Sequence, residues 1–219
     1  MHNTVQNLIK IEEEIKLNLS DLKVLNLPKI IAVSKTFKID KITPLIDHGH
    51  IDFGENKIQE AIDKWAEIKS NNSKIKLHMI GKLQTNKVKF AVKLFDYIHS
   101  VDTQKLAKKI ADEQKKVNKE LKVFIQVNIG NEEQKSGINK TELSDLVLYC
   151  KKINLDVIGL MCIPPMNKNS SQYFKEINLL NTSYDFPELS MGMSSDYIEA
   201  SKNFASYLRI GSSIFGKRV

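Results

Sequence analysis

Short apolar runs alternate with amphipathic segments along nearly the whole chain. The runs are rich in isoleucine, valine and leucine, a composition typical of strands that are buried on both faces. Most of them are followed by a segment with apolar residues at helical spacing. This pattern predicts strands at residues 30–34, 51–54, 77–81, 97–101, 122–128, 156–161, 188–191 and 207–211.

An additional helix is expected before the first strand, within residues 1–26. Glutamate and lysine occupy most of its polar positions, which indicates one buried face and one solvated face. The apolar positions of this helix are Leu8, Ile11, Ile15, Leu19 and Leu22. Pro28 then ends the linker to the first strand.

Two later helices begin with sequences of capping-box form, in which a polar residue is followed three positions later by glutamine or glutamate. These sequences are residues 56–59 and 139–142. We therefore expect the side chains of Asn56 and Asn139 to cap the helices that follow them.

Strands that alternate with helices predict a parallel sheet, because each crossover between parallel strands supplies a helix. Eight strands are the number that closes a (β/α)8 barrel of the TIM type, and 219 residues suffice for one such domain. The alternative, an open doubly wound sheet, usually has a glycine-rich turn after its first strand. Residues 34–38 contain no glycine. We therefore expect an α/β fold with a single barrel domain at residues 30–219, preceded by the extra N-terminal helix.

The charge pattern argues against nucleic acid as a partner. The net charge is +7, but the basic residues are almost all lysines that alternate with acidic residues. Nucleic-acid binders usually cluster arginine and aromatic side chains. Cys150 and Cys162 fit neither a metal site nor a disulfide framework, and no segment resembles a signal peptide or a membrane span. The sequence predicts a soluble, cytoplasmic protein with no metal site.

The last two predicted strands lead into residues that suit an anion. Gly211, Ser212 and Ser213 can present backbone N–H groups and hydroxyls after the eighth strand, and Ser194 can add a hydroxyl after the seventh. Barrels often bind phosphate in these loops. Ordinary turns and N-caps also use glycine and serine, so both interpretations stay open at this point.

Lys35 directly follows the first predicted strand. Alone, it is most simply a solvated residue at the end of a core strand. A desolvated lysine, however, has a lowered pKa and becomes a nucleophile toward carbonyl groups. Such a lysine beside a phosphate site suits a phosphosugar, as in lysine-dependent aldolases, or pyridoxal 5′-phosphate (PLP).

Arg209 lies on the last predicted strand and is one of only two arginines, with Arg218, in a lysine-rich chain. An arginine that faces the pyridine nitrogen of PLP can only donate, so that nitrogen stays unprotonated and the ring is a weaker electron sink. The alternative is a strand residue engaged in a salt bridge. By residue type alone, His78 is expected to be a core histidine rather than a ligand, and Met161, Met191 and Met193 to be core packing.

These residues lie in longer blocks that resemble the PLP homeostasis protein family, whose fold is similar to the amino-terminal barrel of alanine racemase. The matching blocks are residues 32–35, 53–56, 78–87, 159–161, 189–196 and 209–216. They extend from near residue 30 to the carboxyl terminus and keep one order, so the resemblance is specific.

The resemblance implies that Lys35 holds PLP as a Schiff base and that Arg209 faces its pyridine nitrogen. Asn56 and Met161 are expected to line the pocket. The phosphate is assigned to Ser194, Gly211 and Ser212. The chain departs from the family at residues 200–206, which lack the usual glycine and isoleucine before the last strand. This departure puts the local turn geometry in question.

The expected function is that of a non-catalytic PLP-binding protein, most simply a monomer, that maintains vitamin B6 balance and exchanges PLP with PLP-dependent apo-enzymes. The first alternative is a PLP-dependent amino-acid racemase. Racemisation needs an acid and a base on opposite faces of the cofactor, and only Lys35 is an evident candidate. The chain also ends soon after the predicted barrel, without the second domain of alanine racemase. A lysine-dependent aldolase is the third interpretation, disfavoured because no carbonyl-side acid is evident.

Overall fold

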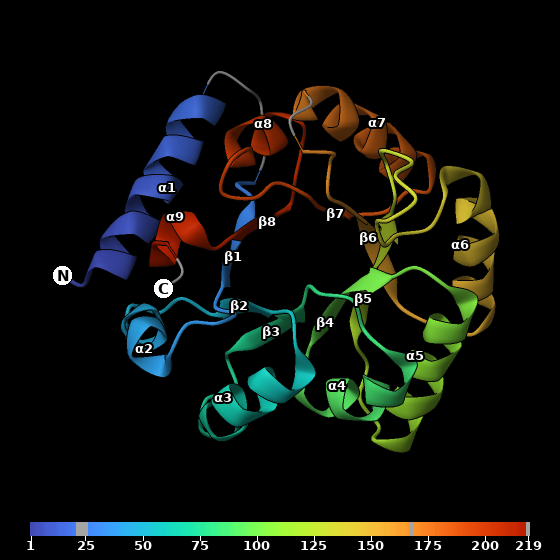
Figure 1. Cartoon of the computed structure of the whole chain (residues 1–219), viewed down its shortest axis with the longest axis horizontal. Helices are drawn as coiled ribbons and strands as arrows, with labels where there is room; N and C mark the ends of the chain where they lie inside the picture. The colour runs from blue at the N-terminus through green and yellow to red at the C-terminus, as the bar shows by residue number, and fades with distance from the viewer. Residues whose placement is uncertain (21–25, 167–168, 218–219) are drawn as a thin grey trace.

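The computed structural model describes residues 1–20, 26–166 and 169–217 and forms a closed barrel of eight parallel strands (Figure 1). The strands are β1 (Lys29–Val33), β2 (Asp52–Glu55), β3 (Lys76–Met79), β4 (Tyr97–Val101), β5 (Lys122–Val127), β6 (Val157–Cys162), β7 (Glu188–Ser190) and β8 (Tyr207–Ile210). Neighbours in the barrel follow chain order, and β8 closes it by pairing with β1, with Leu208 opposite Ile30. The predicted barrel is confirmed, and the open doubly wound sheet is excluded.

The helices surround the barrel as the outer layer of the fold (Figure 1). The α-helices are α1 (Asn3–Leu19), α2 (Ile39–Asp47), α3 (Ile58–Asn71), α4 (Val88–Leu94), α5 (Gln104–Lys116), α6 (Leu143–Lys152), α7 (Ser170–Ser183), α8 (Tyr197–Lys202) and α9 (Ser212–Phe215). Short 3-10 turns, η1 (Thr85–Lys87) and η2 (Lys140–Glu142), precede α4 and α6. Asn139 caps η2, since its side chain accepts a hydrogen bond from the Thr141 N–H at 3.1 Å, which confirms that predicted cap.

The predicted strands match the observed ones within two residues at each end. The largest difference is at β3, which ends at Met79 instead of residue 81. Beyond this end, a Cβ at Gly81 would lie 2.5 Å from the carbonyl oxygen of Asn56, so only glycine fits there. Gly81 thus lets the ends of β2 and β3 approach closely at the mouth of the barrel.

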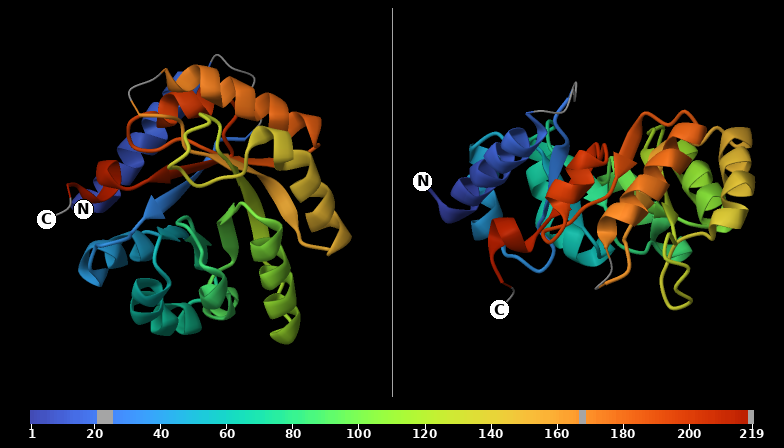
Figure 2. Two further views of the ribbon diagram at one scale, coloured as in Figure 1. Left: turned by 45° about the vertical axis from the view of Figure 1, so that its right-hand side comes forward. Right: turned by 90° about the horizontal axis from the view of Figure 1, so that it is seen from above.

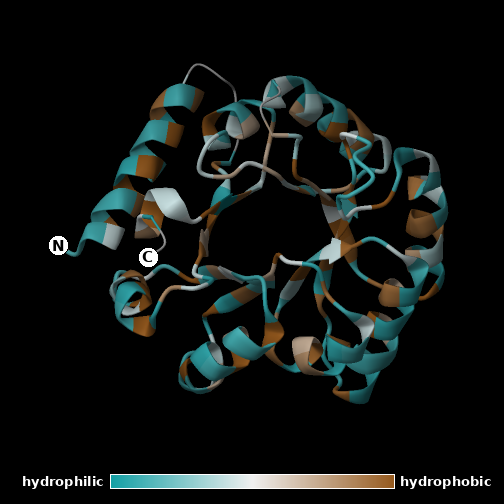
Figure 3. Cartoon of the chain, viewed as in Figure 1, coloured by the Kyte–Doolittle hydropathy of each residue, from teal (hydrophilic) through white to brown (hydrophobic). Residues whose placement is uncertain are grey.

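The core has two layers, one between strands and helices and one inside the barrel. The outer layer contains Ile30, Ala32 and the apolar faces of the helices, whose polar residues face outward (Figure 3). The interior cluster comprises Ile31, Phe124, Ile158, Met161 and Tyr207. Successive residues of β1 therefore serve different layers, as strand geometry requires.

The N-terminal helix packs beside α9 and α8, as two views show (Figures 1 and 2). Its buried face includes the predicted Leu8, Ile11, Ile15 and Leu19. The predicted Leu22 lies outside the described residues. A hydrogen bond of 2.9 Å from Asn7 Nδ2 to the carbonyl oxygen of Ile214 ties α1 to α9. None of the helices in the described part of the chain is long and apolar enough to cross a membrane.

Candidate functional site

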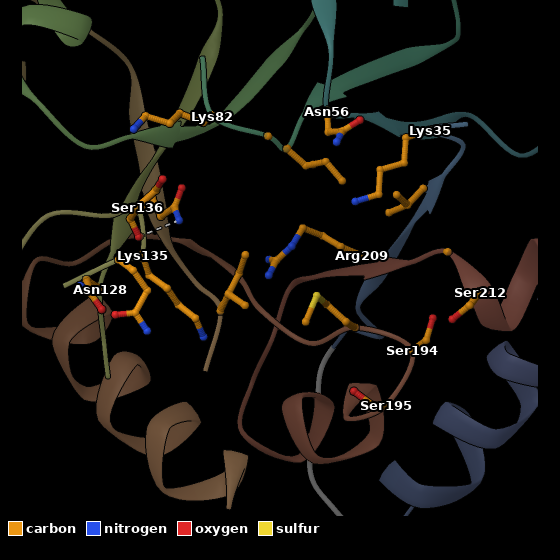
Figure 4. A pocket seen from close by; sticks show the side chains of 18 of the residues that line it. Lys35, Asn56, Lys82, Asn128, Lys135, Ser136, Ser194, Ser195, Arg209 and Ser212 are labelled. Atoms are coloured by element: carbon orange, nitrogen blue, oxygen red, sulfur yellow. Dashed lines mark hydrogen bonds between the residues drawn. The ribbon is translucent and has the colours of Figure 1, made fainter. Parts of the chain in front are cut away.

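A cavity of about 870 Å³ opens at the carboxyl ends of the strands (Figure 4). Its lining residues are Val33, Lys35, Asn56, Ile80, Gly81, Lys82, Gln126, Asn128, Gln134, Lys135, Ser136, Ile163, Met193, Ser194, Ser195, Arg209, Gly211, Ser212 and Lys217. The loop between β5 and η2, yellow-green in Figure 2, projects on the same side of the barrel as α9. The cavity thus occupies the position where (β/α)8 barrels place their sites.

The lining of the cavity is strongly cationic. It includes four lysines, Lys35, Lys82, Lys135 and Lys217, and the guanidinium of Arg209, and no carboxylate among the described lining residues. Lys135 is offset by Glu132 of its own loop, with 2.7 Å between Nζ and Oε2. Like charges that converge on one concave surface focus a positive potential. The cavity is therefore suited to an anionic ligand.

Lys35 follows β1 and is held between two other elements of the barrel mouth. The next residue, Thr36, has a φ of 68° and donates its backbone N–H to the Glu60 carboxylate of α3. Phe37 stacks on Phe215 of α9, with 4.9 Å between ring centroids. In Figure 4 the Lys35 side chain extends into the cavity. The turn after β1 therefore fixes the backbone from which this amine reaches the cavity.

A buried ionic cluster supports this turn from behind. Glu55 is fully buried, and its Oε1 atom accepts hydrogen bonds from Ser34 Oγ at 2.7 Å, Lys64 Nζ at 2.9 Å and Trp65 Nε1 at 3.0 Å. Lys64 Nζ also donates to the carbonyl oxygen of Ser34 at 2.9 Å. The ends of β1 and β2 are therefore joined through α3, directly next to the positions of Lys35 and Asn56.

Asn56 does not cap α3, so the predicted capping box at residues 56–59 is wrong. The N-cap of α3 is Lys57, and it makes no side-chain cap hydrogen bond. The Asn56 side chain lines the cavity instead, next to Lys35 (Figure 4). Its Oδ1 atom is buried without a hydrogen-bond partner among the described residues. Because an unpaired buried amide oxygen is costly, this atom marks a place for a donor from a ligand or water.

The serines and glycine after β7 and β8 converge on one side of the cavity. Ser194 and Ser212 lie near each other in Figure 4, and Gly211 lies between β8 and α9. The two loops are joined by a hydrogen bond of 3.3 Å from the Ser213 N–H to Ser194 Oγ. Gly192, with a φ of 85°, lets the loop after β7 pack closely on α8, because a Cβ there would lie 2.5 Å from Ala200 Cβ. Paired hydroxyls and backbone N–H groups of this kind suit a phosphate.

Arg209 projects from β8 into the base of the cavity and is 4% exposed. Its Nη1 donates to Ser190 Oγ at 2.7 Å, and its Nη2 donates to the carbonyl oxygen of Cys162 at 2.8 Å. Burial lowers the pKa of the guanidinium, but arginine stays protonated in proteins. The salt bridge that was the alternative role of this side chain is replaced by two hydrogen bonds to neutral groups.

Two methionines near the site lie in different environments. For Met161, residue type predicted core packing and the family resemblance implied a place in the pocket lining; it is fully buried inside the barrel with Ile31 and Tyr207 and is not among the described lining residues. Met193, expected as core packing, lines the cavity. Met191 is fully buried in the core, as predicted. Residue type alone does not distinguish these positions, because methionine suits both environments.

No role was predicted from the sequence for Lys82, Lys135 or Lys217, which also line the cavity. Lys82 lies in the block 78–87, directly after Gly81, so its position after a strand was a usable signal. Lys135 belongs to the long loop after β5 and Lys217 follows α9. Surface lysines are so frequent in this chain that neither one stands out in the sequence.

The departure at residues 200–206 has a clear structural consequence. Phe204, between α8 and β8, adopts a φ of 67°, and its side chain is 63% exposed. A positive φ favours glycine and is a strained conformation for a bulky side chain. The turn is thus retained with a residue that does not favour it, and β8 still places Arg209 in the cavity.

No group of three or more His, Cys, Asp or Glu side chains in the described part of the chain has the geometry of a metal site. His78 is fully buried and hydrogen-bonded at both ring nitrogens, to Asp52 and His99. The expectation of a satisfied core histidine is confirmed.

Comparison with known proteins places this architecture among its relatives. A model of the alanine racemase N-terminal domain matches residues 12–219. A pyridoxal phosphate homeostasis protein of Aquifex aeolicus is 36% identical over 203 residues, which cover 88% of both chains. The structure of PipY from Synechococcus elongatus with PLP bound aligns with a TM-score of 0.80 and 31% identity, over 92% of this chain and all of that chain.

The racemases are more distant. An alanine racemase of Clostridium difficile aligns with a TM-score of 0.73 at 15% identity, and the alignment covers 98% of this chain but 56% of that chain. Similarity at this level shows a shared barrel fold and no more.

Proposed function

Because this chain belongs to the pyridoxal phosphate homeostasis protein family, we propose that it binds PLP in the cavity at the mouth of the barrel and serves PLP homeostasis without catalysing a reaction. One observation carries this proposal. The Lys35 amine enters the same cavity as the Arg209 guanidinium and the hydroxyls of Ser194 and Ser212. The amine suits the aldehyde of PLP, the fixed cation suits its pyridine nitrogen, and the hydroxyls suit its phosphate.

The residues of the cavity fit this cofactor by their chemistry. The Lys35 amine condenses with the aldehyde carbon of PLP with loss of one water, so that the lysine holds the cofactor covalently. Ser194, Ser212 and the backbone of Gly211 hold the phosphate. The Asn56 oxygen that lacks a partner accepts a hydrogen bond at the edge of the site, from water or from a protonated group of the ligand.

Arg209 is assigned to the pyridine nitrogen. A guanidinium can only donate, so it stabilises the unprotonated nitrogen by a charge-assisted hydrogen bond. When bound, PLP supplies an electron sink, and that sink is weak while the nitrogen stays unprotonated. Arg209 therefore suits the holding of PLP better than the stabilisation of a carbanion.

A racemase remains the alternative function, and the site disfavours it. Racemisation needs groups that exchange protons on both faces of the cofactor. The titratable groups of the described cavity lining are lysines and Arg209, of which Lys35 is assigned to covalent attachment. A relative at 36% identity carries a homeostasis name, whereas the alanine racemase, at 15% identity, shares only the fold.

We further propose that the chain acts as one PLP-binding unit, a monomer of the cytoplasm, and that PLP-dependent apo-enzymes receive the cofactor from it. Reversible attachment at an open cavity supports exchange with other proteins. The two buried cysteines are free, which suits a reducing compartment.

The proposed function is tested by titration of purified protein with PLP, followed through the visible absorbance of the imine. We expect saturation at one PLP per chain. Lys35→Ala should lose the band, while the matched control Lys82→Gln, another lysine of the cavity, should retain it. Incubation of the loaded protein with amino acids in D2O then separates the two functions. Steady incorporation of deuterium at the α-carbon would support the racemase and contradict the proposal.

A further inference from the structure

A chain of hydrogen bonds crosses the barrel interior from Arg209 to the opposite end of the strands. Arg209 Nη1 lies 2.7 Å from Ser190 Oγ, and Ser190 Oγ lies 2.9 Å from His99 Nδ1. His99 Nε2 lies 2.9 Å from His78 Nδ1, and His78 Nε2 lies 2.9 Å from Asp52 Oδ1. Asp52 is the first residue of β2, so the chain ends at the end of the barrel opposite the cavity.

The chemistry of the two terminal groups fixes the direction of every bond. Arg209 has only donors, so the Ser190 oxygen accepts from it and the Ser190 hydroxyl hydrogen is available for His99 Nδ1. His99 then carries its proton on Nε2 and donates to His78 Nδ1. His78 in turn carries its proton on Nε2 and donates to the Asp52 carboxylate. In this arrangement each bond has one donor and one acceptor, and both imidazoles are neutral.

The packing of the two rings supports this assignment. His78 stacks on Tyr97 with 4.3 Å between centroids and an angle of 10°, and His99 stacks on Phe124 at 4.3 Å and 24°. Both histidines are fully buried. Burial is the largest cause of a lowered pKa for each of them. Stacking therefore fixes the orientation of both imidazole rings, and burial keeps them neutral.

We infer that His99 is a positioning residue for the cofactor site, which orients the Arg209 guanidinium through the hydroxyl of Ser190. Without an acceptor at His99 Nδ1, the Ser190 hydroxyl hydrogen is free to rotate about the Cβ–Oγ bond. The oxygen lone pair that accepts from Arg209 Nη1 then no longer has a fixed direction. Within the described structure, the only other hydrogen bond of the Arg209 guanidinium is the one to the Cys162 carbonyl. The inference rests on the proposed function in one respect, which is that Arg209 faces bound PLP.

Three variants test the inference. His99→Leu removes the acceptor, whereas His99→Asn keeps an acceptor oxygen near the position of Nδ1. Ser190→Ala removes the link and leaves both Arg209 and His99 in place. The rate of PLP release from each loaded protein is measured after dilution into a trap, together with the position of the visible band, which responds to the environment of the pyridine nitrogen. Thermal unfolding identifies any variant that is not folded.

We expect His99→Leu and Ser190→Ala to release PLP about fivefold faster than the unmodified protein, the effect of weakening one hydrogen bond to a charged group, and to shift the visible band. His99→Asn should stay within about twofold of the unmodified protein, since it preserves the acceptor. Equal release rates and band positions in all folded variants would overturn the inference.

A measurement without PLP separates this inference from the proposed function. Nitrogen-15 NMR of histidine-labelled apo-protein at neutral pH reports which ring nitrogen carries the proton. We expect His78 and His99 both to be protonated at Nε2 only. A proton on His99 Nδ1 would overturn the inference even if PLP binds. Failure of the unmodified protein to bind PLP would instead overturn the proposed function, and the His99 tautomer would still decide the direction of the chain.

Discussion

Ser34 and Glu55 are joined by a hydrogen bond of 2.7 Å between Ser34 Oγ and Glu55 Oε1. Ser34 directly precedes Lys35, and Glu55 directly precedes Asn56. Both Lys35 and Asn56 line the cavity at the barrel mouth. The same Glu55 oxygen accepts from Lys64 at 2.9 Å. The end of β1 and the end of β2 are thus held together by a buried charge and its counter-ion, and the two cavity residues keep a fixed separation.

Lys64→Met is expected to lower the free energy of unfolding by about 3 kcal/mol, because it leaves the Glu55 carboxylate buried without a counter-ion. The measurement is urea-induced unfolding at pH 7. The double variant Glu55→Gln with Lys64→Met, which removes both charges, should recover more than half of that loss. If the single and double variants unfold at the same urea concentration, the buried ion pair does not stabilise the joined ends of β1 and β2.

Phe204→Gly is expected to raise the free energy of unfolding by about 1 kcal/mol, because Phe204 adopts a φ of 67° that costs a side chain with a Cβ. The residue is 63% exposed, so little packing is lost. Phe204→Ala is the matched control, since it removes the ring and retains the Cβ. Thermal unfolding distinguishes the two, and an equal gain in both variants would show that the exposed ring, not the backbone, is responsible.

Much of the fold could be predicted because its signals are local. Each strand is a short apolar run, and eight such runs separated by helical patterns leave few arrangements other than a closed barrel. The ends of the strands were less certain. Just after β3, Gly81 lies close to the backbone of Asn56, and a contact between segments that are separate in the sequence is not visible in a local pattern.

The site was predictable where a residue follows a strand at the barrel mouth, as with Lys35, Ser194 and Gly211. The site was not predictable where the role of a residue depends on which way its side chain points. Met161 points into the barrel interior and Met193 lines the cavity, although both are methionines near strand ends. Asn56 fits an N-cap by sequence, but α3 begins with Lys57 as its N-cap, which leaves the Asn56 amide to the cavity.

Stability is expected to decrease as the pH falls below about 6.5, because burial lowers the pKa of His50, His78 and His99 from the ordinary value of a histidine. Below that pH the unfolded chain binds protons that the folded chain does not accept. The free energy of unfolding is therefore highest above pH 6.5, and it decreases as the pH falls toward the pKa values of these histidines in the folded protein. Over this range each histidine lowers the free energy of unfolding by up to ~1.4 kcal/mol for each pH unit.

Urea-induced unfolding at pH 7.5 and pH 5.5 measures this dependence. His99→Asn provides the control, since it removes one of the three groups and should reduce the slope with pH. A free energy of unfolding that is equal at both pH values in the unmodified protein would contradict neutral buried histidines.

Both cysteine thiols are expected to resist modification in the folded protein. Cys150 and Cys162 are fully buried, and burial raises the pKa of each thiol to about 12. Because the thiolate is the reactive form, Ellman's reagent should react with neither thiol at pH 8 and with both in guanidinium chloride. Rapid reaction of a thiol under native conditions would show that its burial is not maintained in solution.

Reduction followed by peptide mapping identifies the lysine that holds PLP, which we propose to be Lys35. The protein is loaded with PLP, treated with borohydride, digested and analysed by mass spectrometry. We expect the reduced pyridoxyl phosphate group on the peptide that contains Lys35, and no such group on the Lys35→Ala variant at the same PLP concentration. Modification mainly at Lys82, Lys135 or Lys217, or no modification of the unmodified sequence, would contradict it.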